Sequence, residues 1–490
     1  MGETTSLLER LAESLDDDRR PLAFVAAGAV AAGIAVRSLG GKGFAMWIGN
    51  SFLILAVVCG VILLIAVAPA AFRRRVGALT DHAQADQSRA TVGGRVILGV
   101  HAGRSAIEYG AVLIDGDPAQ PLGGLPIKEI IPTRTRAHPG SGREAVYQSI
   151  AGALVDLIRD IGDRTADAVA IALPGLVDVR ERTLESSAGG LPPNSQVANE
   201  VARRIIKDHP AAAHKFGLTD VAALAGRIYL DNDARAIGRY VVNQRRQGWH
   251  NYACILVSEG VGSCLILGSR VYYGSFTGAG ETGHQTLQLS DDRVLHLGGS
   301  TGDSAAELVV PDCRCRKAGL HFEMIANDVG VVSMAQALNP KIFAGLAEAL
   351  GLAPENVMRY DVLLAAAERS LGSEAPAHLQ LPAAVADLVD SDAYRTYFAA
   401  FINQYARLLA IGAANLVNVL DLDNVVFTGP VVSAFDRIDM FSQRLQAYRA
   451  QYVIREDRVG MPIEPHLADH IWEGAALVIR DLDYADFMRP

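Results

Sequence analysis

The sequence is poor in cysteine and carries no excess of positive charge. It has five cysteines among 490 residues, and one of them, Cys59, lies in an apolar stretch. Only Cys313 and Cys315 are close together in the chain. This pattern excludes a disulfide framework and indicates that the main body of the protein occupies a reducing compartment. The net charge of -9 also argues against a broad nucleic-acid-binding surface, so we expect no nucleic acid partner.

Charged residues are missing altogether from two runs near the N-terminus. Residues 21–36 form an uncharged run of 16 that is rich in Ala, Gly and Val, and residues 43–72 form an uncharged run of 30. The second run exceeds the ~20 residues that a helix needs to cross a bilayer. We therefore predict a membrane hairpin over residues 21–75, with spans at about 21–36 and 49–72. For the shorter first run, an interfacial or buried helix is the alternative.

Basic residues indicate the orientation of this hairpin. Arg73, Arg74 and Arg75 directly follow the second span, whereas only Arg37 and Lys42 lie between the two runs. Because basic residues favour the cytoplasmic side of a membrane, both ends of the hairpin and the large C-terminal body are predicted to face the cytoplasm. The expected location is the cell (inner) membrane, with the lipid bilayer as a partner.

Two short segments flank the hairpin, and a globular body follows. Residues 1–20 predict a short amphipathic N-terminus, and residues 76–91 predict a polar linker. The chain as a whole is 50% hydrophobic and 20% charged, which is typical of a globular α/β protein. Its length allows two or three domains.

Strand and helix patterns alternate along the first part of the body. Apolar runs at residues 96–100, 111–114 and 168–172 predict buried strands. Residues 142–161 and 196–207 predict helices.

Three polar residues follow the next predicted strand. That strand ends at Leu230, and Asp231, Asn232 and Asp233 precede a helix that begins at Ala234. Polar groups at the carboxyl end of a strand are typical of functional sites in open α/β sheets. Asp233 is therefore a candidate carboxylate base, with a role as helix N-cap as the alternative.

The C-terminal half contains glycine-rich turns and clustered Cys, His and Glu residues. The first is a turn between two predicted strands at Gly260-Val261-Gly262, and the second is a glycine-rich loop with Glu281 and His284. A segment with Cys313, Cys315, His321 and Glu323 follows. The last is a helix and strand that lead to Gly429-Pro430.

In this order the motifs resemble the ROK family (repressor, open reading frame, kinase) of sugar kinases and sugar-responsive regulators, over residues 95–485. The resemblance implies an α/β, two-lobed actin-like ATPase (ribonuclease H-like) fold, here preceded by one or two transmembrane helices. It places the N-terminal lobe at residues 92–230 and the C-terminal lobe at 231–490, with the final helix returning to the first lobe. It also implies a homo-oligomer. The helix-turn-helix of the family's regulators has no counterpart in this sequence.

The resemblance further implies a sugar site. In the family's kinases, the aspartate of the Asn-Asp-Ala motif takes the proton from the attacking sugar hydroxyl, and it corresponds to Asp233. The residues expected to hold the sugar hydroxyls are Asn232, Glu281, His284 and Glu323. All five positions are intact, so a sugar ligand is predicted.

The nucleotide motifs of the family are altered in this chain. The first phosphate motif, Asp-x-Gly-Gly-Thr, reads His101-Ala102-Gly103-Arg104-Ser105, so the carboxylate that serves Mg²⁺ is absent. The second, Gly-Thr-Gly-x-Gly, begins with Ser258-Glu259, which sets a like charge against a polyphosphate. The degenerate nucleotide-binding residues are His101, Gly103, Arg104, Ser105, Gly260, Gly262 and Gly429.

These alterations favour a membrane-anchored, sugar-binding sensor or scaffold. The alternative is an active hexose or N-acetylhexosamine kinase that uses Mg-ATP and Asp233 as base. A transcription regulator is disfavoured by the acidic charge and the membrane segment.

A zinc site is also implied, because zinc-containing members of the family use the histidine of the Glu-x-Gly-His loop and three cysteines. His284, Cys313 and Cys315 match this pattern, and His321 lies one residue beyond the third cysteine position. Together they form a Cys₂His₂ set that is chemically suited to zinc. The alternative is a pair of buried thiols without a metal.

Overall fold

The computed structural model describes the body of the chain. The described residues are 94–104, 106–115, 126–139, 142–186, 191–244, 249–288, 294–297, 306–309, 313, 319–352, 358–372 and 381–481. Contacts divide the chain into two units, residues 1–93 and 94–490, and the described residues belong to the second. The predicted N-terminal helix (1–20), membrane spans (21–36 and 49–72) and linker (76–91) lie outside the described residues, as do Ser105 and Cys315. Within the described ranges, no helix is long and apolar enough to cross a bilayer.

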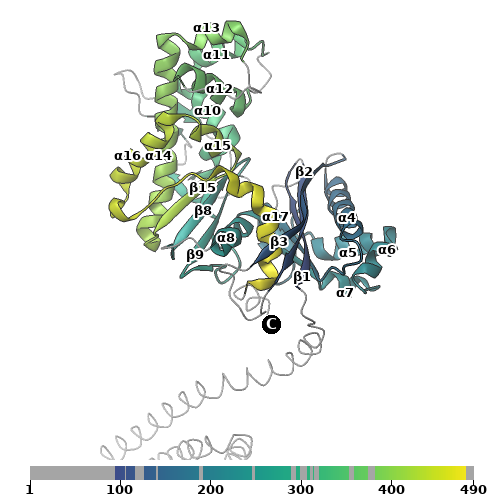
Figure 1. The fold of residues 1–490 in the computed structure, drawn as a ribbon. Coiled ribbons are helices and arrows are strands. Elements are labelled where there is room, and N and C mark those ends of the chain that lie inside the picture. The colour runs from purple at the N-terminus through teal and green to yellow at the C-terminus, as the bar shows by residue number, and fades with distance from the viewer. Residues whose placement is uncertain are drawn as a thin grey trace, which may run out of the picture. The chain divides into compact units, whose positions relative to one another are not determined.

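The first half of the body is built on a five-stranded sheet (Figure 1). Its strands, in spatial order, are β3 (Ile127–Ala137), β2 (Ala106–Ile114), β1 (Arg95–Ala102), β4 (Ala168–Leu173) and β7 (Ile228–Asn232). Strands β1, β4 and β7 are parallel, and β2 is antiparallel to both of its neighbours. All six residues of β4 are buried, as expected for a central strand with both faces covered. The strands predicted at 96–100, 111–114 and 168–172 are confirmed.

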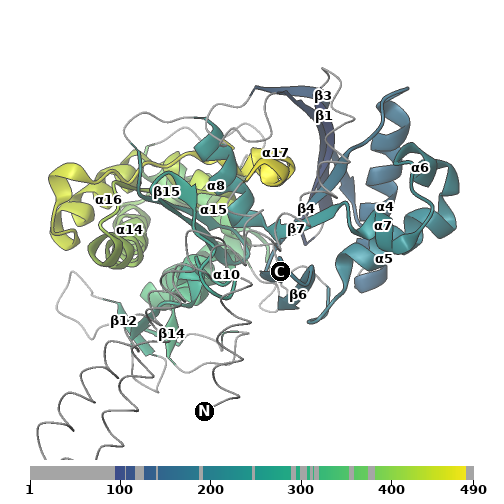
Figure 2. The ribbon, with the colours of Figure 1, turned by 90° about the horizontal axis from the view of Figure 1, so that it is seen from below.

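Helices cover the outer face of this sheet (Figure 2). They are α4 (Arg143–Asp160), α5 (Val197–Asp208), α6 (Pro210–Lys215) and α7 (Val221–Ala225). The helices predicted at 142–161 and 196–207 match α4 and α5 to within one residue at each end. A small hairpin of β5 (Leu176–Asp178) and β6 (Thr183–Ser186) follows β4.

The second half is built on a four-stranded sheet in the order β10-β9-β8-β15. Its strands are β8 (Tyr252–Val257), β9 (Val261–Leu267), β10 (Arg270–Val271) and β15 (Asn424–Thr428). Strand β8 is antiparallel to β9 and parallel to β15. The predicted turn at Gly260-Val261-Gly262 begins too late, because Val261 and Gly262 already pair with Val257 and Leu256 inside the sheet.

Alternate residues of β8 serve two hydrophobic cores, because successive side chains of a strand point to opposite faces. Cys254 and Leu256 belong to the core shared with the first sheet, whereas Ala253 and Ile255 belong to a core within the second half. The first core includes α8 (Asp233–Asn243). The second is enclosed by α14 (Asp392–Leu420), α15 (Pro430–Asp436) and α16 (Asp439–Tyr452).

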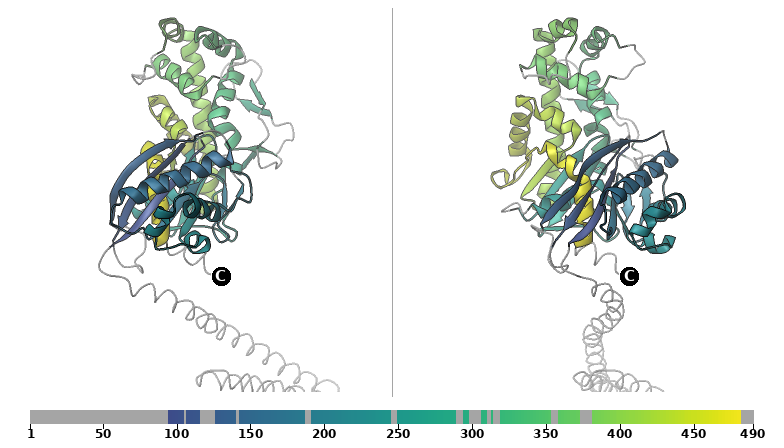
Figure 3. Two further views of the ribbon diagram at one scale, coloured as in Figure 1. Left: turned by 90° about the vertical axis from the view of Figure 1, so that its right-hand side faces the viewer. Right: turned by 45° about the vertical axis from the view of Figure 1, so that its right-hand side comes forward.

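A group of helices extends the second half, and Figure 3 shows most of this group in green in the upper part of both views. It consists of α9 (Glu323–Ala326), α10 (Asp328–Leu338), α11 (Pro340–Ala349), α12 (Tyr360–Ser370) and α13 (Ala383–Val389). Two short strand pairs precede it along the chain. These are β11 (Thr286–Gln288) with β14 (Leu320–His321), and β12 (Val294–Leu297) with β13 (Ala306–Val309).

The last helix, α17 (Ile471–Ala476), contacts β1, β2, β4 and α8 (Figure 2). Trp472 packs on two glycines of the first sheet. A Cβ at Gly99 would lie 2.4 Å from the Trp472 carbonyl oxygen, and one at Gly110 would lie 2.5 Å from its ring. A Cβ at Gly474 would lie 1.9 Å from the Ala236 carbonyl oxygen of α8. Glycine at these positions therefore permits α17 to lie against both β1 and α8.

Candidate functional site

A cleft of about 780 Å³ is lined by residues from both halves of the body. The parallel strands of each sheet end at this cleft, namely β1, β4 and β7 of the first sheet and β8 and β15 of the second. His101, Pro174, Asn232, Ser258 and Gly429 stand at or just beyond these carboxyl ends. Ligands of open α/β sheets bind at this edge of the strands. The cleft is therefore the candidate functional site.

The structure gathers most of the predicted site residues on this one cleft. Those that line it are Asn232, Asp233, Glu281, His284, Glu323, His101, Gly103, Arg104, Gly260, Gly262 and Gly429. Cys313 and His321 do not line the cleft and are buried next to His284. The cleft also contains acidic residues that the sequence did not single out as ligands, including Glu108 and Asp328.

Asp233 is the first residue of α8, and its carboxylate lines the cleft. The Oδ1 atom accepts the Ala234 backbone N–H at 2.8 Å. Burial raises the pKa of this carboxyl, and the charge of the nearby His101 partly offsets the rise. A carboxylate whose pKa is raised toward neutral pH is suited to act as a general base.

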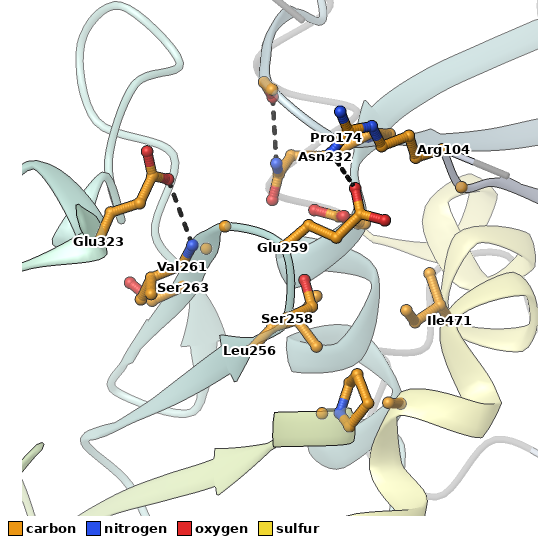
Figure 4. Close-up of a pocket in the computed structure, with 18 of the residues that line it drawn as sticks. Arg104, Pro174, Asn232, Leu256, Ser258, Glu259, Val261, Ser263, Glu323 and Ile471 are labelled. Carbon is orange, nitrogen blue, oxygen red and sulfur yellow. Dashed lines mark hydrogen bonds and ion pairs between the residues drawn. The ribbon is translucent and has the colours of Figure 1, made fainter. Parts of the chain in front are cut away.

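Asn232, and not Asp233, is the N-cap of α8. Its Oδ1 accepts the backbone N–H of Arg235 at 3.2 Å, so the alternative role of Asp233 as helix cap is wrong. Its Nδ2 donates to the Gly175 carbonyl oxygen at 3.1 Å, as Figure 4 shows, and this fixes the loop after β4. The amide retains one N–H and one lone pair with which it can contact a ligand.

The loop that carries Glu281 and His284 is fixed to strand β9. Ser263 Oγ donates to the Gly280 carbonyl oxygen at 2.7 Å and also hydrogen-bonds the Thr282 hydroxyl. Gly280 has a φ of 95°, and a Cβ there would lie 2.3 Å from the Ser263 carbonyl oxygen. Glycine is therefore required at this position for the loop to reach the cleft wall.

Glu281 shares the cleft with other carboxylates. Its side chain is 45% exposed, and because it lines the cleft, part of this exposure is to the cleft interior. Burial by the cleft walls raises the pKa of Glu281, and the charges of Glu323 and Asp233 raise it further, against the opposing charge of His284. Carboxylates that can accept hydrogen bonds or protons are therefore concentrated at this end of the cleft.

Glu323 joins the cleft to the cysteine segment. One oxygen, Oε2, accepts the Val261 backbone N–H at 3.3 Å, as Figure 4 shows. The other, Oε1, lies 3.8 Å from the Cys313 Sγ. The carboxylate is thus held between β9 and the cysteine, facing the β8–β9 turn.

The predicted metal ligands converge next to this carboxylate. Ligand atoms of His284, Cys313 and His321 all lie within 4.8 Å of one another. The pairing of β11 with β14 brings this about, because it sets His321 opposite Thr286, two residues after His284.

The geometry of these three residues fits a zinc ion. His284 Nδ1 and Cys313 Sγ are 3.5 Å apart, and a nitrogen and a sulfur bound to one tetrahedral zinc are about 3.6 Å apart. The other ring nitrogen of His284, Nε2, lies 3.6 Å from Glu281 Oε2. One histidine can therefore serve both the metal set and the cleft. The fourth predicted ligand, Cys315, lies outside the described residues.

At the predicted nucleotide end of the cleft, the side chains of His101 and Arg104 are each paired with a carboxylate of the chain itself. His101 Nδ1 lies 3.3 Å from Glu108 Oε2, and Arg104 Nη1 donates to Glu259 Oε2 at 2.8 Å. Mg²⁺ is bound in proteins by free carboxylates, waters and substrate phosphates. The two carboxylates engaged in these pairs therefore fit a Mg²⁺ ion poorly.

Sequence reasoning missed a buried ion-pair network beneath α8. Asp231 pairs with both Arg235 and Arg239, and Arg239 Nε donates to Asp481 at 2.8 Å. These four side chains are each 3% exposed or less. Arg235 and Arg239 are four residues apart and lie on one face of α8, whereas Asp231 lies in β7, just before the helix. The repeated spacing of four residues between oppositely charged side chains is the signal that could have pointed to the network.

Arg235 connects this network to the cleft. Its Nη1 donates to the Thr277 carbonyl oxygen, in the loop that leads to Glu281. Its Nη2 donates to the Val177 carbonyl oxygen of β5 at 3.3 Å. Arg235 thereby fixes two cleft loops to the first turn of α8.

Taken together, the two sheets, the cleft at their carboxyl ends and the interposed helix α17 define a two-lobed protein of the actin-like ATPase fold. The chain belongs to the ROK family, whose model matches residues 129–479.

Solved structures of the same fold include kinases and a regulator. A ROK family glucokinase from Streptomyces griseus, in complex with glucose and AMPPNP, has a TM-score of 0.51 at 17% identity, covering 78% of this chain and 98% of its own. A ROK family transcriptional regulator, a homolog of the E. coli MLC protein, has a TM-score of 0.51 at 15% identity, covering 81% of this chain and 80% of its own. A glucokinase from Balamuthia mandrillaris, in complex with glucose, has a TM-score of 0.50 at 12% identity, covering 80% and 96%.

One curated relative matches a shorter segment. It is the "Putative xylose repressor" of Caldicellulosiruptor sp. strain Rt8B.4, which is 28% identical over 129 residues, or 25% of this chain. The chain spans about a quarter (27%) of the length of that relative.

Proposed function

We propose that the chain binds a sugar in this cleft and acts as a membrane-anchored sensor or scaffold that faces the cytoplasm, without obligatory phosphoryl transfer. The observation that carries the proposal is the convergence of the predicted sugar residues on one cavity of about 780 Å³, within the size range of small-molecule sites. These residues are Asn232, Asp233, Glu281, His284 and Glu323. The self-paired side chains at the other end of the cleft favour a role without phosphoryl transfer.

The chemistry of these side chains suits a polyhydroxylated ligand. Each sugar hydroxyl is both a donor and an acceptor, so a sugar needs carboxylate acceptors together with N–H donors. Glu281 and Glu323 supply acceptors, and Asn232 and His284 supply N–H groups. Asn232 is hydrogen-bonded to the Gly175 carbonyl oxygen, and Glu323 accepts the Val261 backbone N–H. The loop that carries Glu281 and His284 is hydrogen-bonded to Ser263. These contacts hold the side chains in place before a ligand arrives.

Calorimetric titration of the full chain in detergent micelles with hexoses and N-acetylhexosamines tests this proposal. We expect binding by the parent, and a loss of about 1–3 kcal/mol of binding free energy in Glu281→Ala, because hydrogen bonds to a charged acceptor are lost. Glu456→Ala is the matched control, since Glu456 is exposed and does not line the cleft. A parent chain without affinity for any sugar of the panel contradicts the proposal.

A second candidate function is an ATP-dependent sugar kinase, which the raised pKa of Asp233 favours. In this reaction a sugar hydroxyl oxygen bonds to the γ-phosphorus of ATP, the bond to the ADP oxygen breaks, and the hydroxyl proton passes to Asp233. The test is sugar-dependent release of ADP, which Asp233→Asn should abolish. Turnover that persists in that variant removes Asp233 as the base, and sugar binding without turnover in the parent supports the sensor.

We also propose a zinc ion at His284, Cys313 and His321, with Cys315 as fourth ligand. A structural zinc would hold the Glu281–His284 loop against the segment that carries Glu323. Metal analysis of the purified full chain should give about one zinc per chain, and Cys313→Ala should remove it. Cys264→Ala is the matched control, because Cys264 is a buried thiol of β9 outside this set. A folded parent free of metal contradicts the proposal.

The membrane anchor remains a proposal that rests on the two uncharged runs, 21–36 and 49–72. The full chain should stay in the membrane pellet after extraction with alkaline carbonate, and a chain without residues 21–75 should not. Protease added to intact spheroplasts should leave the body uncut. The proposed homo-oligomer is tested on the same detergent preparation by light scattering.

A further inference from the structure

Arg104 and Glu259 meet across the cleft. Arg104 lies in the turn between β1 and β2, and Glu259 lies 155 residues later in the turn between β8 and β9. The Arg104 Nη1 donates to Glu259 Oε2 at 2.8 Å, and Figure 4 shows the two side chains joined within the pocket. The pair therefore links the two sheets at one end of the cleft.

Each partner is positioned by its own half of the body. The Gly103 carbonyl oxygen, next to Arg104, lies 3.0 Å from His138 Nε2. The Glu259 carbonyl oxygen accepts from Asn327 Nδ2 at 3.3 Å. Because a hydrogen bond holds each turn to its own half of the body, the guanidinium and the carboxylate are paired before any ligand binds.

The charge around this pair is negative overall. The hydrogen bond and charge of Glu259 raise the pKa of Arg104, and the charge of Asp328 adds to the rise. Burial raises the pKa of Asp328, and the like charge of Glu259 raises it further. Two carboxylates thus surround one guanidinium. Among the described residues that line the cleft, the arginines are Arg104 and Arg235, and Arg235 is paired with Asp231.

We propose that Glu259 is a specificity-determining residue that makes this end of the cleft reject polyphosphate ligands. It engages the guanidinium that a phosphate group would need, and its negative charge adds to that of Asp328. An uncharged sugar does not need the Arg104 guanidinium and is not repelled by the two carboxylates. The inference rests on the proposed function only in that it takes this cleft as the ligand site.

The test is a gain of binding. The side chains of Arg104 and Glu259 are 53% and 45% exposed, so their ion pair contributes little to stability and Glu259 can be replaced without unfolding the chain. The full chain in detergent micelles is titrated calorimetrically with inorganic tripolyphosphate. We expect no measurable binding by the parent at millimolar concentration, and binding by Glu259→Gln that is tighter by at least about tenfold, because Arg104 is released for a charge-assisted hydrogen bond.

Three further variants make the result specific. Arg104→Gln combined with Glu259→Gln should lose the gain, because the guanidinium is then absent. Glu348→Gln, on the exposed surface of α11, changes the net charge equally and should give no gain. Glu259→Thr replaces Glu259→Gln if the latter melts at a lower temperature than the parent. The proposal is overturned if the parent binds tripolyphosphate as tightly as Glu259→Gln, or if the double variant keeps the gain.

Titration of the same preparations with the sugar panel separates this inference from the proposed function. If no sugar binds but Glu259→Gln gains tripolyphosphate binding, the proposed function fails and the role of Glu259 stands. If sugar binds and neither Glu259 variant gains tripolyphosphate binding, the role of Glu259 fails and the proposed function stands.

Discussion

Two groups of arginine–carboxylate pairs in this molecule have the same chemistry and different surroundings. Arg239 is 0% exposed and pairs with Asp231 and Asp481 beneath α8, whereas Arg104 is 53% exposed and pairs with Glu259 across the cleft. A buried charge that loses its partner cannot be solvated, so the loss is costly. A half-exposed charge that loses its partner is solvated by water at little cost.

The comparison shows that burial, and not the identity of the ion pair, decides what the pair does. Burial alone lowers the pKa of an arginine, but the charges of Asp231 and Asp481 and the hydrogen bond to the Tyr273 hydroxyl outweigh it and raise the pKa of Arg239 well above its usual value. Arg239 is therefore charged and paired, and it fixes α8 to the segment that carries Asp481. The cleft pair instead determines the charge that a ligand meets.

The largest expected effect comes from the buried group. Arg239→Met should lower the free energy of unfolding by about 3–5 kcal/mol, because it leaves Asp231 and Asp481 buried with less compensation. Urea unfolding of the full chain in detergent micelles measures the change. Arg458→Met is the matched control, because the Arg458 side chain is 73% exposed. If Arg239→Met and Arg458→Met were equally stable, burial would not decide how much an arginine contributes to stability.

Asp233 is intermediate between the buried ion-pair network and the half-exposed cleft pair, because burial raises its pKa while its side chain lines the cleft. In the unfolded chain this carboxyl ionises near its ordinary pKa of about 3.9. Its burial penalty is therefore absent below that pH, grows as the pH rises from there toward the higher pKa of the folded state, and is fully present above that pKa. Asp233→Asn should thus be more stable than the parent at pH 7.5, by on the order of 1 kcal/mol, with a smaller difference near pH 4. An unfolding titration in which the variant is the less stable chain at pH 7.5 contradicts this reasoning.

The smallest effect is expected in the cleft. Arg104→Met should lower the free energy of unfolding by less than about 1 kcal/mol, and the loss should shrink further at high salt, because the pair is half-exposed and screened. The same urea titration at low and high ionic strength measures it. A loss as large as that of Arg239→Met would mean that the cleft pair also holds the two halves together.

Much of the local architecture follows from the sequence. Apolar runs such as 168–172 predict buried strands because both faces of a central strand are covered, and β4 occupies that run. The polar residues after Leu230 predict a site at a strand end, and Asn232 and Asp233 do line the cleft. The order of the glycine, Asn-Asp-Ala and Glu-x-Gly-His motifs indicates the ROK family, and the family match confirms it. These features lie within short segments, so neighbouring residues are enough to specify them.

Other features depend on the exact residue at which a helix begins and on the direction in which each side chain points. Whether Asn232 or Asp233 caps α8 depends on where the first turn of the helix begins, and a shift of one residue exchanges the two roles. Asp231 is next to the site in sequence, yet its side chain points away from the cleft into the buried ion-pair network. Successive residues at a strand end point in opposite directions, and the sequence alone does not say which of them meets the ligand.

The long-range contacts of the cleft and of the buried ion-pair network were decided only by the tertiary structure. Arg104 and Glu259 are 155 residues apart, and Arg239 and Asp481 are 242 residues apart. His284 and Cys313 are 29 residues apart and meet beside the paired strands β11 and β14. The sequence by itself determined which motifs supply the cleft, because strand ends and motifs are local. It could not determine which charges neutralise one another, because that depends on the packing of segments far apart in the chain, and the Coulomb energy of a pair depends on its separation and burial.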